Sequence, residues 1–137
     1  MKRLAFVLVL AALVCAVSVP GTAQDAAKGK KIFESYCKTC HQVNGQGMPK
    51  IYPPVAKSDY IKKTPTETLI REVVFGLSGK VTVNGKEYNG VMTPLPSKYK
   101  DQDVADVLTY VFTNFGNSKG KVTVKEVAAA KKKGKIK

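Results

Sequence analysis

The run Cys37-Lys38-Thr39-Cys40-His41 constrains this chain more than any other feature of its sequence. A C-x-x-C-H run is typical of covalent haem attachment, because two thiols three positions apart can each add to one vinyl group of the same porphyrin. The histidine after the second cysteine then lies under the iron as its proximal ligand. The motif therefore predicts one haem c, covalently bound through Cys37 and Cys40, with His41 as a metal ligand.

Two other kinds of site use similar cysteine pairs. A structural zinc site normally takes four protein ligands, whereas the chain after residue 23 offers only two cysteines and one histidine. A thioredoxin-like redox pair needs no histidine directly after it and occurs with a βαβ pattern that this sequence lacks. Haem attachment is therefore the favoured interpretation.

The first residues, 1–23, are predicted to be a secretory signal peptide. Lys2 and Arg3 precede an apolar run over residues 4–19, and the small residue Ala23 favours cleavage just after it. The alternative is an uncleaved membrane anchor, for which the run is somewhat short. Export predicts a periplasmic protein. The cysteines that remain after cleavage would both be used by the haem, so no disulfide is expected even in an oxidising compartment.

Positive charge is concentrated at the C-terminus. The whole chain carries a formal charge of +13, and residues 116–137 contain eight lysines and one acidic residue. Such a field favours acidic partners and speeds their encounter at low salt. Residues 117–137 are therefore interpreted as a basic extension. It is either a solvated, frayed tail or a docking arm for an acidic protein or an anionic membrane surface. Nucleic acid is not an expected partner of an exported protein with no other binding signal.

Hydrophobic periodicity predicts a mainly α fold over residues 24–116. Three or four helices and a small β-hairpin are expected to surround the haem. The expected helices cover 25–36, a stretch from 64 that ends at Gly76 or Gly79, 101–115 and, more weakly, 124–133. Residues 42–58 are too rich in glycine and proline for a long helix.

Local signals predict where several of these elements begin and turn. Thr64 reads as a helix cap, with proline and glutamate at the positions that complete a capping box. Asp101 is expected to cap the next helix, and Thr123 the last. Asn84-Gly85 predicts a two-residue type I′ turn between strands at 81–83 and 86–88.

The second axial ligand of the iron is predicted to be Met92. No histidine other than His41 exists in the chain, so methionine is the usual remaining choice. Met48 follows His41 by only seven residues, in a loop tied to the proximal side. Met92 follows by fifty-one residues, in a loop braced by Pro94 and Pro96 that can cross the opposite face.

With these residues in view, the chain resembles the class I c-type cytochromes, and in particular the small bacterial monohaem ones, over about residues 25–116. Gly29 and Phe33 match the small and aromatic positions of that family's first helix. Val107 and Tyr110 match the positions of the last helix that meet them. The resemblance implies a close crossing of the first and last helices, which glycine permits.

The same resemblance extends to both ligand loops. The stretch 52–56 is similar to the family loop whose proline carbonyl accepts a hydrogen bond from the proximal histidine. Pro53 is the expected acceptor and Pro54 the alternative. The stretch 89–95 is similar to the loop that carries the axial methionine, although Thr93 separates Met92 from Pro94.

The resemblance implies an electron-transfer protein that is not an enzyme, because two axial ligands leave no open position on the iron. Its partners would be redox proteins, and the protein itself is expected to be a monomer. The expected rim of the docking surface is basic and includes Lys38, Lys50, Lys57 and Lys98. Two alternatives stay open. One is a cytochrome subunit of a nitrite reductase or quinoprotein dehydrogenase complex; the other is a haem enzyme or gas sensor in which Met92 dissociates.

Overall fold

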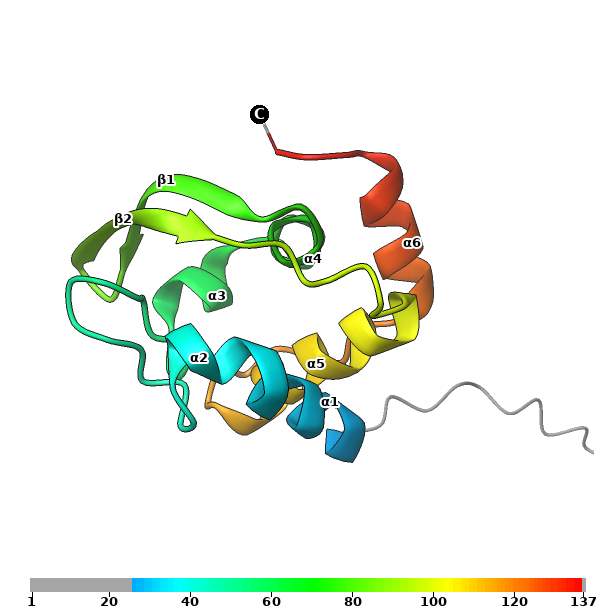
Figure 1. Ribbon diagram of the computed structural model, residues 1–137, viewed down its shortest axis with the longest axis horizontal. Helices are drawn as coiled ribbons and strands as arrows, with labels where there is room; N and C mark the ends of the chain where they lie inside the picture. The colour runs from blue at the N-terminus through cyan, green and yellow to red at the C-terminus, as the bar shows by residue number, and fades with distance from the viewer. Residues whose placement is uncertain (1–25, 137) are drawn as a thin grey trace, which may run out of the picture.

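The computed structural model describes residues 26–136, in which helices make up most of the molecule and one antiparallel hairpin lies along its edge (Figure 1). The predicted signal peptide and its cleavage site lie outside the described residues. In chain order the elements are α1 (Ala26–Ile32), η1 (Phe33–Cys37), α2 (Lys38–His41), α3 (Asp59–Lys63), α4 (Thr66–Phe75), β1 (Leu77–Val83), β2 (Lys86–Met92), α5 (Asp101–Asn114) and α6 (Val124–Lys132). The predicted mainly α fold with a small hairpin is confirmed. Within residues 26–136, no helix is both long and apolar enough to cross a bilayer.

The first helical run is longer than the sequence pattern indicated. The helix expected to end at Tyr36 continues without a break to His41, because no glycine or proline interrupts it before Gly45. Its middle, Phe33–Cys37, is π-helical rather than α-helical. Single π-helical turns of this kind occur often at functional sites. The two cysteines and His41 therefore lie at the end of one continuous helical segment.

The first and last helices of the body cross closely, as the resemblance implied. Gly29 packs on α5 so tightly that a Cβ there would clash with the carbonyl group of Asp106 and lie 3.0 Å from Cβ of Tyr110. Next to this crossing, the ring of Phe33 lies 5.7 Å from that of Tyr110 and 5.0 Å from that of Phe115. Glycine is therefore required by the distance between two backbones, and the aromatic cluster fills the space beside it.

Helix α4 leads directly into the hairpin. It ends at Gly76, whose φ of 78° and ψ of 167° suit glycine and few other residues. The predicted cap at Thr64 is wrong. The N-cap position is Pro65, which has no side-chain acceptor, and the amide of Thr64 instead closes α3 by donating to the Tyr60 carbonyl. Short α3 was not expected from the sequence, and it ends at Thr64, the residue that was predicted to cap α4.

The hairpin has the predicted turn but longer strands. Asn84 and Gly85 both have positive φ, 51° and 73°, as a type I′ turn requires. Backbone pairing continues past Gly79 and Gly90 until Leu77 lies opposite Met92. The expectation that Met92 lies in an irregular loop is thus wrong in one respect, because it is the last residue of β2. The side-chain pattern does not reveal this extension, since the glycines interrupt the alternation.

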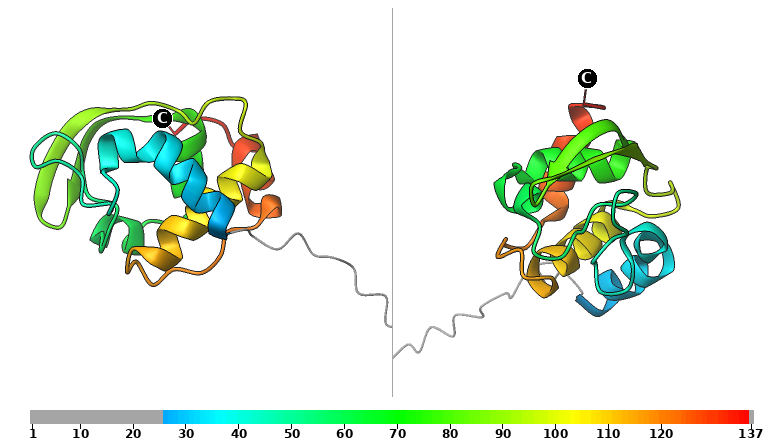
Figure 2. Two further views of the ribbon diagram at one scale, coloured as in Figure 1. Left: turned by 60° about the horizontal axis from the view of Figure 1, so that its bottom comes forward. Right: turned by 90° about the vertical axis from the view of Figure 1, so that its left-hand side faces the viewer.

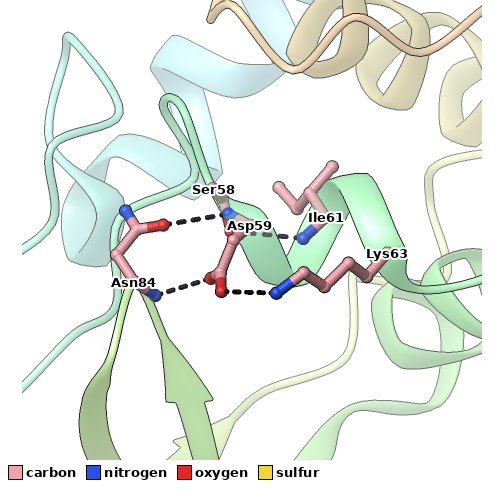
Figure 3. A network of polar contacts seen from close by, with 5 residues as sticks. All are labelled: Ser58, Asp59, Ile61, Lys63 and Asn84. Carbon is pink, nitrogen blue, oxygen red and sulfur yellow. Dashed lines mark hydrogen bonds and ion pairs between the residues drawn. The ribbon is translucent and has the colours of Figure 1, made fainter.

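The tip of the hairpin is tied to α3 by a reciprocal pair of hydrogen bonds (Figure 3). The amide of Asn84 donates to Asp59 Oδ1 at 2.6 Å, and the amide of Asp59 donates to Asn84 Oδ1 at 2.9 Å. Lys63 adds an ion pair with Asp59 at 3.2 Å, and Ser58 caps α3 by accepting from the Ile61 amide. The hairpin is consequently held at both ends, at its tip by α3 and at its base by α4.

Helices α5 and α6 begin close to where the sequence predicted. The predicted cap at Asp101 is wrong by one position. Lys100 occupies the N-cap, and its amide donates to the carboxylate of Asp103 at 2.7 Å. The capping box at Thr123 and Glu126 is confirmed, with both reciprocal hydrogen bonds present.

Helix α6 packs on the body and does not fray. Val127 and Ala130 are fully buried, and α6 contacts both α4 and α5. Figure 2 shows it beside α4, away from the hairpin tip. Lys131 pairs with Asp101 at 2.6 Å. The interpretation of the C-terminus as a solvated tail is therefore wrong for 124–132, because an alanine-rich face lets the helix lie close to its neighbours.

Candidate functional site

His41 is held by the loop that follows it. Its Nδ1–H donates to the carbonyl oxygen of Pro53 at 2.9 Å, so Pro53 and not Pro54 is the acceptor. The loop folds back because the amide of Gly47 donates to the His41 carbonyl and the amide of Val55 donates to the Gly45 carbonyl. A Cβ on Gly47 would lie within 2.7 Å of the Pro53 backbone. Ring orientation is thus fixed by backbone contacts close in sequence.

The His41 ring is prepared to act as a ligand. Burial lowers the pKa of His41, and the hydrogen bond to Pro53 only partly opposes that effect. The ring is therefore neutral at physiological pH, with its proton on Nδ1 and a lone pair on Nε2. A neutral imidazole whose other nitrogen donates to a carbonyl is the usual state of a metal-binding histidine.

The cysteine side chains lie on the helical run that ends at His41, and they line a cavity together with that residue. Cys37 and Cys40 are both half-buried, and neither forms a disulfide. Burial raises the pKa of the Cys37 thiol to about 12, so this sulfur is protonated and a weak nucleophile in the free protein. Within residues 26–136 no group of three or more histidine, cysteine or acidic side chains could hold a metal ion.

Met92 also borders this cavity, in a segment fixed by distant parts of the chain. A Cβ on Gly76 would come within 2.7 Å of the Met92 carbonyl oxygen. The hydroxyl of Tyr36 donates to the Pro94 carbonyl at 2.9 Å and lies 2.8 Å from the Thr93 hydroxyl. The amide of Leu95 donates to the Val73 carbonyl at 2.8 Å. The methionine is therefore positioned by α4, by the hairpin and by the helix that precedes the cysteines.

The predicted haem-binding side chains line two adjoining cavities. The inner one, about 120 Å³, has almost entirely apolar walls, and the outer one, about 350 Å³, opens beside the cysteines. Cys37, His41 and Met92 line both. Met48 lines neither; it pairs with Tyr52 in the loop after His41 and is 38% exposed. A neutral imidazole, a thioether and two thiols around an apolar space fit a covalently bound haem.

Sequence reasoning missed one functional candidate in the cavity wall. Glu72 is only 6% exposed and lines the inner cavity, where the hydroxyl of Tyr60 donates to its Oε1 at 2.5 Å. Burial raises the pKa of Glu72, and the bond from Tyr60 acts in the opposite direction. The one sequence signal that could have revealed Glu72 is its position in the helix. Glu72 lies three residues after Leu69 and directly before Val73, on the apolar face of α4.

Comparison with known proteins gives a consistent picture. The family model described as Cytochrome c matches residues 26–114. The chain is 39% identical over 102 residues to a cytochrome c-552 of Thermus thermophilus, covering 72% of this chain and 68% of that protein. It is 30% identical over 125 residues to cytochrome c6 of a Picosynechococcus species, covering 86% and 97%. It is also 27% identical over 109 residues to the cytochrome c subunit of gluconate 2-dehydrogenase from Pantoea cypripedii, of which it spans only 25%.

Proposed function

The chain belongs to the cytochrome c family, as a class I electron-transfer cytochrome with covalently bound haem c, and from that premise we propose that its haem is held between His41 and Met92. Cys37 and Cys40 form the thioether links, and the Pro53 carbonyl orients the proximal imidazole. The observation that carries the proposal is that His41 and Met92 line the same cavity, whereas Met48 does not. Bound haem supplies one iron that exchanges single electrons.

The protein residues have three tasks in this proposal. Burial keeps the imidazole neutral, and the hydrogen bond from His41 to Pro53 orients the ring and raises its basicity as a ligand. A thioether opposite histidine raises the reduction potential relative to a second histidine. The apolar walls exclude water from the iron. With both axial positions filled, substrate has no open site, so the protein is a carrier and not an enzyme.

We place this carrier in the periplasm, as a monomer that meets its partners transiently. The support is the signal-like sequence before residue 24 and the net positive charge. Acidic redox proteins are the expected partners, docking near the exposed lysines Lys38, Lys50, Lys57 and Lys98. Small, weak interfaces of this kind permit rapid exchange.

A lasting subunit of a dehydrogenase complex is the second candidate. It is favoured by the likeness to cytochrome subunits of dehydrogenases, although this chain spans only about a quarter of each. The basic residues after 116 would then form the anchor, and part of that charge is already paired internally, as in Lys133 with Glu67. Purification with a larger enzyme that survives a high-salt wash would favour the subunit over the shuttle.

The ligand assignment is tested by the optical spectrum of the purified holoprotein. The ferric protein is expected to show the weak long-wavelength band of methionine-ligated haem. Met92→Ala should lose this band while it keeps its covalent haem, and Met48→Ala is the matched control that should keep both. A band that persists in Met92→Ala would refute the assignment. Prompt carbon monoxide binding to the reduced wild type at neutral pH would favour a gas-binding role instead.

A further inference from the structure

A buried carboxyl group lies in the wall of the haem cavity. Glu72 is 94% buried, and it borders the inner cavity from α4. It accepts a hydrogen bond from Tyr60, which reaches it from α3 and borders the same cavity. Unpaired ionised carboxylates are unfavourable in such surroundings, because burial penalises the charged form. This acid has no task in axial ligation.

The other titratable groups that line the inner cavity do not compete with Glu72 for a proton. They are Tyr36, Cys37, His41 and Tyr60. Once haem is attached, the Cys37 sulfur is a thioether and the His41 ring is bound to iron, so neither titrates. The Tyr36 hydroxyl is engaged by Thr93 and Pro94. Burial together with the bond to Glu72 raises the pKa of Tyr60, which stays a protonated donor.

Charged groups on the neighbouring elements also point elsewhere. Helix α5 and strand β1 contribute only apolar side chains to the cavity. On α4 itself, Arg71 binds the carbonyl groups of Gly134 and Lys135, and Glu67 pairs with Lys133, so both face the C-terminal segment. Glu72 is therefore the carboxyl group of the described chain that is placed to respond to a charge inside the cavity.

We propose that Glu72 couples electron transfer to proton transfer: it releases its proton when the haem iron loses an electron and regains it when the iron is reduced. The inference rests on the proposed function, since it needs a redox-active haem in this cavity. In the balanced step, one electron passes from the ferrous iron to the redox partner, and the O–H bond of Glu72 breaks with its proton passing to solvent. The iron gains one positive charge and the carboxyl group one negative charge.

The direction of the coupling follows from the charges. Ferric iron attracts the carboxylate more strongly than ferrous iron does, so the pKa of Glu72 is lower in the oxidised protein. At an effective dielectric constant of about 20, a unit charge about 10 Å away changes a carboxyl pKa by about one unit. Between the two pKa values the reduced protein is protonated and the oxidised protein is not. The reduction potential must therefore fall as pH rises through that window and stay constant outside it.

The test measures the reduction potential of the holoprotein against pH by equilibrium titration. In the wild type we expect a total fall equal to about a tenfold change in the one-electron equilibrium constant, or about 59 mV. Glu72→Gln keeps a hydrogen-bond acceptor for Tyr60 but cannot lose a proton. Its reduction potential should therefore stay, at every pH, at the value that the wild type has at acid pH. Tyr60→Phe removes a bond that favours the carboxylate, so its window should move to higher pH.

Glu67→Gln is the matched control, because Glu67 is a partly exposed carboxyl group on the outer face of the same helix. In Glu67→Gln the reduction potential should change over the same pH range as in the wild type. A pH dependence that survives unchanged in Glu72→Gln, as one carried by the carboxylates of the haem itself would, overturns the proposal. So does a wild-type potential that does not vary with pH.

A measurement on the wild type alone covers the case in which Glu72→Gln does not fold. Inside the window, oxidation by ferricyanide in weakly buffered solution should release protons, detected with a pH-indicating dye. The redox-difference infrared spectrum should show the loss of a protonated-carboxyl band. Oxidation without proton release at any pH contradicts the inference. The methionine band, which reports ligation, is read separately, so failure of this coupling and failure of the proposed function are distinguishable.

Discussion

The segment that carries His41 and the segment that carries Met92 face the same cavity, but they are held by different kinds of contact. His41 ends a continuous helical run, and its hydrogen-bond acceptor Pro53 lies only twelve residues away. Met92 ends a strand whose following residues are bound by Tyr36, 57 and 58 residues earlier in the chain. The contact that orients His41 is thus local in sequence, whereas the segment after Met92 is held by residues far away in the chain. Local opening is expected to begin on the distal side.

The largest effect is expected from disturbing the crossing that supports the proximal helix. Gly29→Ala should lower the free energy of unfolding by roughly 2–3 kcal/mol, because a Cβ would overlap the Asp106 backbone while alanine gains only ~1 kcal/mol in helix propensity. Denaturant titration of the holoprotein measures this. Gly120→Ala is the control, since nothing lies within 4 Å of its Cβ position. Equal effects in the two variants would show that the crossing is not tightly packed.

A smaller effect, confined to the distal side, is expected for Gly76→Ala. The substitution combines backbone strain with contact between a Cβ and the Met92 carbonyl, and should cost about 2 kcal/mol. Its signature is a weaker methionine band with proximal ligation retained. Gly79→Ala separates the two causes, because Gly79 also has positive φ but its Cβ position meets no atom within 4 Å. If Gly79→Ala weakens the band as much, contact with Met92 is not the cause.

Removing one hydroxyl should loosen the distal side without changing its packing. Tyr36→Phe loses the hydrogen bonds to Pro94 and Thr93 and should cost about 1 kcal/mol. We expect faster replacement of the methionine by added imidazole in the ferric protein, measured by stopped-flow absorbance. Tyr99→Phe removes the hydroxyl that contacts Ser35, outside this segment, and serves as control. Unchanged imidazole kinetics in Tyr36→Phe would mean that this tie does not hold the methionine segment.

The smallest effect concerns the hairpin tip and depends on pH. The backbone N–H of Asn84, helped by Lys63, holds the pKa of Asp59 below its usual range. A carboxyl group whose folded-state pKa is lowered contributes stability above its unfolded pKa, and loses it as pH falls through the folded value. The protection factor of the Asn84 amide, which compares its hydrogen exchange with the intrinsic rate at the same pH, should therefore fall under acid conditions. In Asp59→Asn the acid-dependent part of this protection should be absent. In the control Glu87→Gln it should remain.

The same distinction between local and long-range contacts explains which features could be predicted from the sequence. The haem motif and the turn at Asn84-Gly85 depend on neighbouring residues, and local chemistry was enough to predict them, whereas it left Gly76 and Gly79 both open as the end of α4. The strand extension to Met92 depends on backbone pairing across two glycines, which leaves no side-chain pattern. The packing of α6 depends on a complementary surface on α4 and α5, which its own lysine-rich sequence does not reveal.

Glu72 in the cavity wall was missed for the same reason. Glu72 is one acidic residue within an apolar pattern, and only tertiary structure shows that Tyr60 and the cavity lie on that side of α4. Short α3, which supplies Tyr60, was missed because its five residues are too few for a periodicity signal. The cap predicted at Thr64 failed for a related reason, since α3 uses that residue as its own end.

The most direct test of the difference between the two sides is a denaturant titration of the ferric holoprotein, followed at equilibrium by two probes. The methionine band reports the distal side, and helical circular dichroism reports the fold that carries His41. The account predicts that the methionine band is lost at a lower denaturant concentration than the helical signal, and that Tyr36→Phe shifts only the first transition. Coincident transitions that move together in Tyr36→Phe would contradict it.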